Sequence, residues 1–118
     1  MAEYGLFIGW GFPRAGKEAG AYRVFQDAVA YWKELQAAGE IESFDVVALG
    51  YHGGDLNGFA LLRGAPEKLG RLSTAPEFQR RSMRAATCID GVGIVNAAVD
   101  DGAIRQMASW KEAIADLI

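Results

Sequence analysis

The sequence has little of the residue types that proteins use for redox and metal chemistry. Its 118 residues include one cysteine, one histidine and three prolines. A single cysteine excludes an internal disulfide and a cysteine-based zinc site, so we expect neither a metal nor a cofactor. The same scarcity is typical of proteins of the reducing cytoplasm, which is the location we expect.

Positive charge is also scarce. Lys and Arg together number 12 against 15 Asp and Glu, which gives a net charge of -3. An acidic chain does not attract nucleic acid or an anionic membrane, and we expect neither as a partner. The apolar N-terminal run has no basic segment before it and meets glycines and a proline within about ten residues, so neither a signal peptide nor a transmembrane segment is predicted. Because 51% of the residues are hydrophobic, we expect one folded domain over residues 1–118.

The most informative stretch runs from Ile41 to Arg63. It holds two apolar runs joined by the turn sequence HGGDLNG. Two such runs separated by Gly, Asp and Asn indicate a β-hairpin, whose second strand we place at residues 58–63. Alternation of large and small residues predicts a first strand over residues 4–11, and residues 91–99 are predicted as a last strand.

Apolar residues recur at helical spacing between the predicted strands. They predict a helix over residues 21–38, a short helical turn from Ala65, and a helix over about residues 75–86. The pair Thr74 and Glu77 has the spacing of a capping box, in which each side chain accepts from the other residue's backbone amide.

A last helix is predicted near the C-terminus. Asp100 or Asp101 is a suitable N-cap for it. Its apolar residues form a single stripe, made up of Ile104, Met107, Trp110, Ile114 and Leu117.

The predicted order of elements is βαββαβ followed by a C-terminal helix. This order predicts an α+β, ferredoxin-like sandwich with a four-stranded antiparallel sheet and two helices on one face. The strands are apolar on both faces, although two helices cover only one face. The open face would exceed the apolar patch that a monomer tolerates, so we expect a homodimer with a twofold copy.

With this element order and these two-faced strands, the chain resembles the dimeric α/β-barrel superfamily. The group includes antibiotic-biosynthesis monooxygenase-like, YCII-like and stress-responsive barrel proteins. The resemblance implies two ferredoxin-like protomers packed sheet to sheet. In the YCII-like group a histidine and an aspartate form a proposed catalytic pair, and His52 and Asp55 are the comparable neighbours here. Members range from oxygenases, decolorising peroxidases and lactone isomerases to proteins of no known activity, so the fold alone does not choose an activity.

His52 is the first candidate for chemistry. It lies beside Tyr51 and three residues before Asp55, so it can act as a general base that the carboxylate orients. The alternative is a histidine at a strand end, with Asp55 serving the turn.

Residues 11–18, GFPRAGKE, are the second candidate. They nearly match the phosphate-binding P-loop, but Glu18 stands where a hydroxyl would bind magnesium, which argues against nucleotide hydrolysis. A weaker hypothesis keeps Arg14, Lys17 and the start of the following helix as a site for a small anionic ligand. The alternative is a solvated loop.

Four aromatic residues complete the candidate site. Trp10, Trp32, Tyr22 and Tyr51 are predicted to line a pocket between sheet and helix for a small apolar or aromatic molecule. The alternative places Trp32 in the core and Trp10 in the dimer interface. If the protein is an enzyme, cofactor-independent chemistry of the monooxygenase or isomerase kind fits best. The competing hypothesis is a non-catalytic structural or interaction module, which would have a filled interior and leave His52 in solvent.

Overall fold

The computed structural model describes residues 2–118 and contains a single four-stranded sheet in this range. The elements along the chain are β1 (Tyr4–Trp10), α1 (Glu18–Ala37), β2 (Ser43–Ala48), β3 (Gly58–Arg63), α2 (Pro66–Thr74), α3 (Pro76–Cys88), β4 (Gly93–Ala98), α4 (Asp101–Ala113) and the 3-10 turn η1 (Ala115–Leu117). The strand order is β2-β3-β1-β4, and every neighbouring pair is antiparallel. The predicted ferredoxin-like βαββαβ fold with a C-terminal helix is confirmed.

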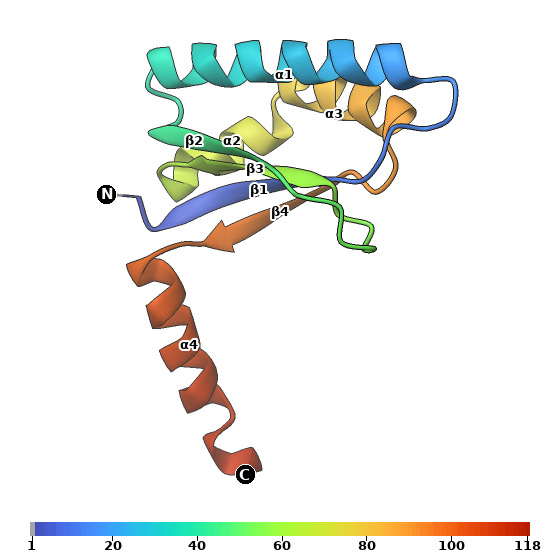
Figure 1. Cartoon of the computed structure of the whole chain (residues 1–118). Helices are drawn as coiled ribbons and strands as arrows, with labels where there is room; N and C mark the ends of the chain where they lie inside the picture. The colour runs from blue at the N-terminus through green and yellow to red at the C-terminus, as the bar shows by residue number, and fades with distance from the viewer. Residues whose placement is uncertain (1) are drawn as a thin grey trace.

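Helices cover one face of the sheet. Figure 1 shows α1 and α3 above the strands, whereas α4 leaves the end of β4 on the opposite side and projects away from the domain. The short helix α2 contacts β1 and α3, so the chain adds a third helix to the two that the pattern required. The other face of the sheet is left open within the protomer.

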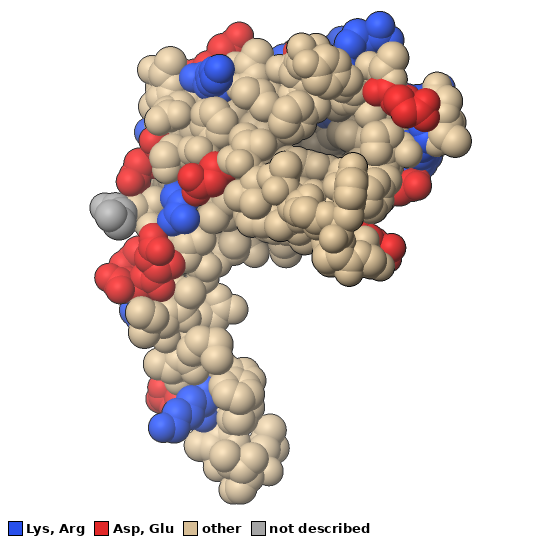
Figure 2. Space-filling model, in the orientation of Figure 1, with Lys and Arg blue, Asp and Glu red and all other residues tan. Residues whose placement is uncertain are grey.

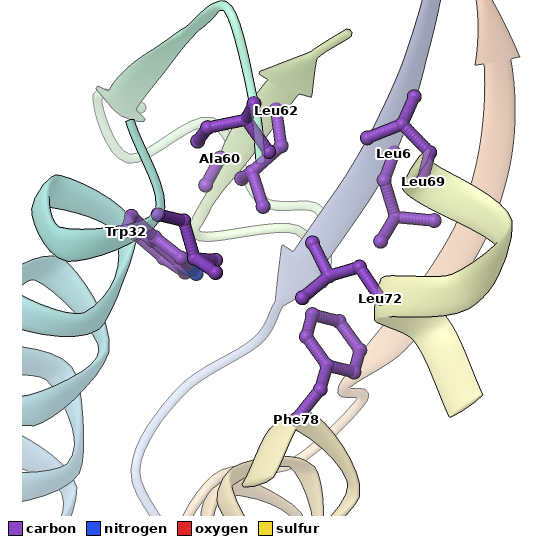
Figure 3. Packing of buried hydrophobic residues seen from close by; sticks show 9 residues of the cluster. Leu6, Trp32, Ala60, Leu62, Leu69, Leu72 and Phe78 are labelled. Atoms are coloured by element: carbon purple, nitrogen blue, oxygen red, sulfur yellow. The ribbon is translucent and has the colours of Figure 1, made fainter. Parts of the chain in front are cut away.

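The core lies between the sheet and these helices. Leu6 pairs with Leu62 across β1 and β3, and both side chains are fully buried. Figure 3 shows them facing Trp32 of α1 and Phe78 of α3, with Leu69 and Leu72 of α2 closing the cluster. Strand alternation therefore places the residues with even numbers in β1 toward the helices and those with odd numbers on the open face.

Helix α1 begins at Glu18, three residues earlier than predicted. Gly16 adopts a φ of 82°, which turns the chain into the helix. The Glu18 carboxylate then accepts hydrogen bonds from the Gly16 backbone N–H at 2.9 and 3.0 Å. This local turn accounts for the earlier start.

The predicted capping box at Thr74 is wrong. Thr74 is the last residue of α2, and its hydroxyl donates back to the Arg71 carbonyl at 3.2 Å. Ala75 becomes the N-cap of α3 because Pro76, which has no N–H and a fixed φ, suits the first helical position. The Glu77 carboxylate instead accepts from Arg81 at 2.9 Å.

The predicted aspartate cap on the last helix is also wrong in its chemistry. Asp100 lies at the N-cap position of α4 but makes no side-chain capping bond. Its carboxylate accepts from Arg63 at 2.9 Å, because the backbone at Asp100 has a φ of 52° and directs the side chain toward β3.

Within residues 2–118, every helix is too short or too polar to span a lipid bilayer.

Candidate functional site: a cavity between the sheet and α1

A cavity of about 250 Å³ lies between α1, the end of α3 and the sheet, near the end of β1. In Figure 2 the molecule is hollowed between the upper helix layer and the strands. The lining is almost entirely apolar and comes from β1 and the following loop, α1, the segment before β3, α3 and the segment before β4: Ile8, Gly9, Trp10, Gly11, Pro13, Glu18, Ala21, Tyr22, Val24, Phe25, Ala28, Trp32, Asn57, Ala85, Ile89 and Val92.

Small residues on the inner face of α1 create this space. Ala21 and Ala28 are two helical turns apart and both line the cavity, and Val24 lies between them on the same face. Ala85 of α3 is the facing small residue. Since an alanine side chain ends at Cβ, these positions leave volume that larger side chains would fill.

Trp10 forms the wall of the cavity that belongs to the sheet. Its ring packs edge-to-face against Phe25 of α1, with ring centroids 5.8 Å apart. Gly58 lies opposite on β3, where an added Cβ would come within 2.9 Å of the Trp10 indole nitrogen. The glycine therefore lets the indole lie across β3, and Trp10 faces the helices. The alternative that placed Trp10 in the dimer interface stays a prediction.

Trp32 serves both the core and the cavity. It is only 4% exposed, and its ring centroid lies 6.0 Å from that of Phe44 on β2. The prediction that Trp32 belongs to the core is confirmed, and the same side chain forms part of the cavity lining. The exposed Tyr22 also contributes to this lining.

Two polar residues join the otherwise apolar lining. Asn57 is held by its backbone N–H, which donates to the Trp10 carbonyl at 2.8 Å and ties the hairpin to β1. Glu18 is held through its carboxylate by the Gly16 amide. A few fixed polar groups in an apolar pocket are what orients a small ligand.

A contact between Tyr31 of α1 and Arg81 of α3 lies next to the cavity. A smaller hollow of about 50 Å³ continues from the cavity and is bordered by Tyr31 and Arg81. The Arg81 guanidinium lies 4.0 Å from the centre of the Tyr31 ring, and its Nε lies 3.1 Å from the Asp27 carboxylate. Burial raises the pKa of the Tyr31 hydroxyl, so this tyrosine stays neutral at physiological pH. The contacts of Arg81 with Tyr31 and Asp27 hold α1 and α3 together beside the cavity.

His52, Tyr51 and Asp55 lie outside this cavity, although Asn57 at the end of the same loop lines it. His52 is exposed, and its Nδ1 donates to the Gly50 carbonyl at 3.0 Å, since a carbonyl oxygen only accepts. Tyr51 is 90% exposed and faces Phe12, with ring centroids 6.1 Å apart. Asp55 is exposed too, and the hydrogen bonds described for residues 2–118 do not join it to His52. The catalytic pair stays a prediction, and Tyr51 lies outside the cavity that was expected to include it.

Arg14 and Lys17 lie beside the cavity mouth. Arg14 forms an ion pair with Asp90 at 2.8 Å, and Lys17 occupies the N-cap position of α1. The Gly16 amide at this helix start is already bonded to the Glu18 carboxylate. A role for the two cations in anion binding stays a prediction. Among residues 2–118 no group of three or more His, Cys, Asp or Glu side chains is arranged to hold a metal ion.

Sequence reasoning missed several lining residues. Phe25 lies within the predicted helix over residues 21–38 but was not expected in a site, and Asn57 was read only as part of the turn. The signal for the cavity itself was the spacing of alanines on the buried face of α1, next to Trp32 on the same helix and opposite Trp10 of the sheet. That pattern predicts a gap only when the distance between helix and sheet is known.

Comparison with known proteins identifies the fold. Neither the family models nor the sequences of curated proteins match this chain. Among solved structures, a dimeric ferredoxin-like protein of unknown function from Bacteroides fragilis is 16% identical, with a TM-score of 0.55 over 82% of this chain and 97% of that chain. A hypothetical protein from Arabidopsis thaliana is 10% identical, with a TM-score of 0.62 over 85% and 90%. SnoaB, a cofactor-independent oxygenase from Streptomyces nogalater, is 14% identical, with a TM-score of 0.55 over 84% and 95%.

At these identities the similarity establishes architecture and leaves activity open. Structures described as dimeric ferredoxin-like proteins and as antibiotic-biosynthesis monooxygenases recur among the matches. The chain therefore has a ferredoxin-like fold, as its sequence predicts.

Proposed function

We propose that the protein is a homodimer in which each protomer binds a small apolar or aromatic molecule in the cavity between α1, α3 and the sheet. The observation that carries the proposal is the aromatic-lined cavity of about 250 Å³. Small-molecule sites span about 300–1,000 Å³, so this cavity suits a compact ligand of up to about three fused rings.

The polar residues of the lining narrow the ligand class. Carboxylate oxygens accept hydrogen bonds, so Glu18 favours a ligand that carries a hydroxyl or amine donor. The Asn57 side chain both donates and accepts, and therefore tolerates either partner. A flat, neutral molecule with one donor at its edge, such as a phenol or an aromatic amine, fits these constraints.

The proposed homodimer rests on the open face of the sheet. This face carries Phe7, Phe59 and Leu61 together with Val95, which is 58% exposed. An apolar sheet face of this kind meets another protein surface in stable proteins. Structures that share the fold are described as dimeric, which supports a second copy as that surface.

Cofactor-independent catalysis is the finer form of this proposal. A cofactor-independent oxygenase shares the fold, and His52 with Asp55 is the candidate base and its partner. Since both residues lie outside the cavity of their own protomer, catalysis by them requires a substrate that extends from the cavity to residues 52–55. The exposed position of His52 favours a protein without catalytic activity. The cavity favours a protein that binds a small molecule over a module with a purely structural role.

Binding of 1-aminoanthracene, a flat fluorescent amine, tests the proposal. The wild-type protein should saturate with one probe per protomer and raise its fluorescence. Ala28→Leu, which fills the cavity, should weaken the probe's affinity at least about tenfold. Ala30→Leu makes the same change on the exposed side of α1 and should bind like wild type. Equal binding by all three proteins would place the probe elsewhere and overturn the proposal.

A further inference from the structure

Helix α4 exposes its apolar stripe to solvent. Ile104 is 68% exposed, Met107 62% and Trp110 57%, whereas the helix ends at Ala113 and leaves the predicted stripe residue Leu117, 74% exposed, in η1. The helix contacts β4 at its start and η1 at its end, and Figure 1 shows its far part projecting away from the domain. An isolated helix of about 12–15 residues is marginal in water, and α4 has 13. Its helical state therefore calls for a packing partner.

The direction of α4 is fixed at its root. Arg105 forms an ion pair with Glu3, and Arg63 donates to Asp100 at 2.9 Å. Gly102 packs so closely on the Glu3 backbone that an added Cβ would overlap the Glu3 carbonyl oxygen. The strained φ of 52° at Asp100 persists because these contacts hold it. The projecting orientation is thus built by specific contacts.

The open sheet face is the second unpartnered apolar surface of the chain. Phe7 and Phe59 stack on it with ring centroids 5.3 Å apart, and Leu61 and Val95 flank the pair in the strand register. Figure 1 shows α4 projecting on this side of the sheet, opposite α1 and α3. A protein seated on the open face would therefore lie alongside α4.

We propose that α4 is an arm exchanged between two copies of this chain, so that each arm packs its stripe against the partner protomer while the two open faces meet. The arm is about 20 Å long at 1.5 Å per residue. Face-to-face sheets pack about 10 Å apart, so an arm of this length passes the partner's sheet and reaches its helix layer. The inference rests on the proposed homodimer and is independent of the proposed ligand.

The charge of the arm selects a protein partner over a lipid surface. Helices that lie on membranes carry many Lys and Arg on their polar face. Here Arg105 is paired with Glu3, so the other cation of α4 is Lys111 in its last turn, against the carboxylates of Asp101 in its first turn and of Glu112. Figure 2 shows the far part of α4 covered mainly by uncharged side chains. Because both apolar surfaces belong to one chain and face one side, a second copy satisfies both at once.

Matched charge substitutions test the arm. Met107→Asp places a carboxylate in the stripe, whereas Ser109→Asp places one on the opposite side of the same helix. Sedimentation equilibrium should find a wild-type mass twice the protomer's 12.7 kDa. We expect Met107→Asp to raise the dimer dissociation constant about thirtyfold or more, because two arms per dimer lose apolar burial, and Ser109→Asp to leave it within about threefold. If Met107→Asp leaves the dimer dissociation constant unchanged, the exchanged arm is wrong but the homodimer stands. If the wild-type protein is monomeric, both proposals are wrong.

A cross-linking experiment decides the case even if Met107→Asp unfolds. The photoreactive amino acid p-benzoylphenylalanine replaces Trp110, and equal amounts of ¹⁴N- and ¹⁵N-labelled protein are mixed before illumination. The exchanged arm predicts covalent dimers that join one light and one heavy chain. Cross-links confined to single chains, or binding of the wild-type monomer to phosphatidylglycerol vesicles with no dimer, would overturn the proposal.

Discussion

Filling the cavity should stabilise the protein, and the sign of this effect tests the geometry. Ala28 is half-buried on the inner face of α1 and borders both the cavity and the smaller hollow. Leucine adds three carbon atoms there. Each buried methylene contributes about 0.8 kcal/mol, which gives an upper value of about 2.4 kcal/mol. Overpacking a filled core would instead cost about 1–3 kcal/mol.

Because about 250 Å³ is free beside Ala28, the burial contribution should exceed the strain. We expect Ala28→Leu to raise the free energy of unfolding by about 1–2 kcal/mol and the Tm by about 4–8 °C. Thermal melts at one fixed protein concentration measure this, since the Tm of a dimer depends on concentration. The exposed control Ala30→Leu should stay within about 0.5 kcal/mol of wild type. If Ala28→Leu lowers the free energy of unfolding by about 1 kcal/mol or more, the space beside Ala28 does not exist.

Three further predictions address the loop, the arm and its pH dependence. His52→Ala should change the free energy of unfolding by no more than about 0.5 kcal/mol, as ordinary surface substitutions do, and should leave 1-aminoanthracene binding intact. Loss of probe binding would place His52 in the site. Gly102→Ala should lower the Tm because the added Cβ meets the Glu3 backbone. Gly70→Ala on α2 adds a Cβ that meets nothing within 4 Å, so it should raise the free energy of unfolding by about 0.5–1 kcal/mol. Equal effects of the two substitutions would contradict the contact between Gly102 and Glu3. The hydrogen bond from Arg105 lowers the pKa of the Glu3 carboxyl. The stabilisation that this ion pair gives is present above the ordinary carboxyl pKa and is lost as the pH falls through the lowered value. Circular dichroism below about pH 4 should therefore show α4 losing helix in the wild type, and Glu3→Gln should show no such step.

The order of strands and helices was predictable because local patterns carry it. The hairpin strand at residues 58–63 was predicted to the residue, since a Gly-rich turn and apolar runs both mark it. The two caps were not predictable in the same way. Thr74 and Asp100 have suitable side chains for caps, but Pro76 and Arg63 decide their bonding, and Arg63 is distant in sequence.

The cavity was predictable only in part. Strand alternation places Trp10 toward the helices, and helical spacing places Trp32 toward the sheet, so both were expected to meet. Tyr51 was grouped with them because it extends the alternation of β2, but β2 ends at Ala48 and the loop carries Tyr51 into solvent. A periodic pattern predicts on which face of a strand or helix a side chain lies. The residue at which a strand ends depends instead on its pairing with the neighbouring strands.

The stripe of α4 shows the same limit. Its spacing predicts an amphipathic helix but does not say which surface the stripe covers. That surface depends on the turn at Asp100 and on the contact between Gly102 and Glu3, which lie at opposite ends of the chain.

The most direct test of the proposed ligand site uses the three tryptophan indoles as reporters. Trp10 and Trp32 line the cavity, whereas Trp110 lies on the arm and serves as an internal control. Two-dimensional ¹⁵N NMR spectra recorded during a titration with 1-aminoanthracene follow the three indole N–H resonances separately. A bound molecule in the cavity predicts saturable shifts of the Trp10 and Trp32 resonances with Trp110 unchanged. Shifts of Trp110 alone, or of none of the three, would contradict binding in this cavity.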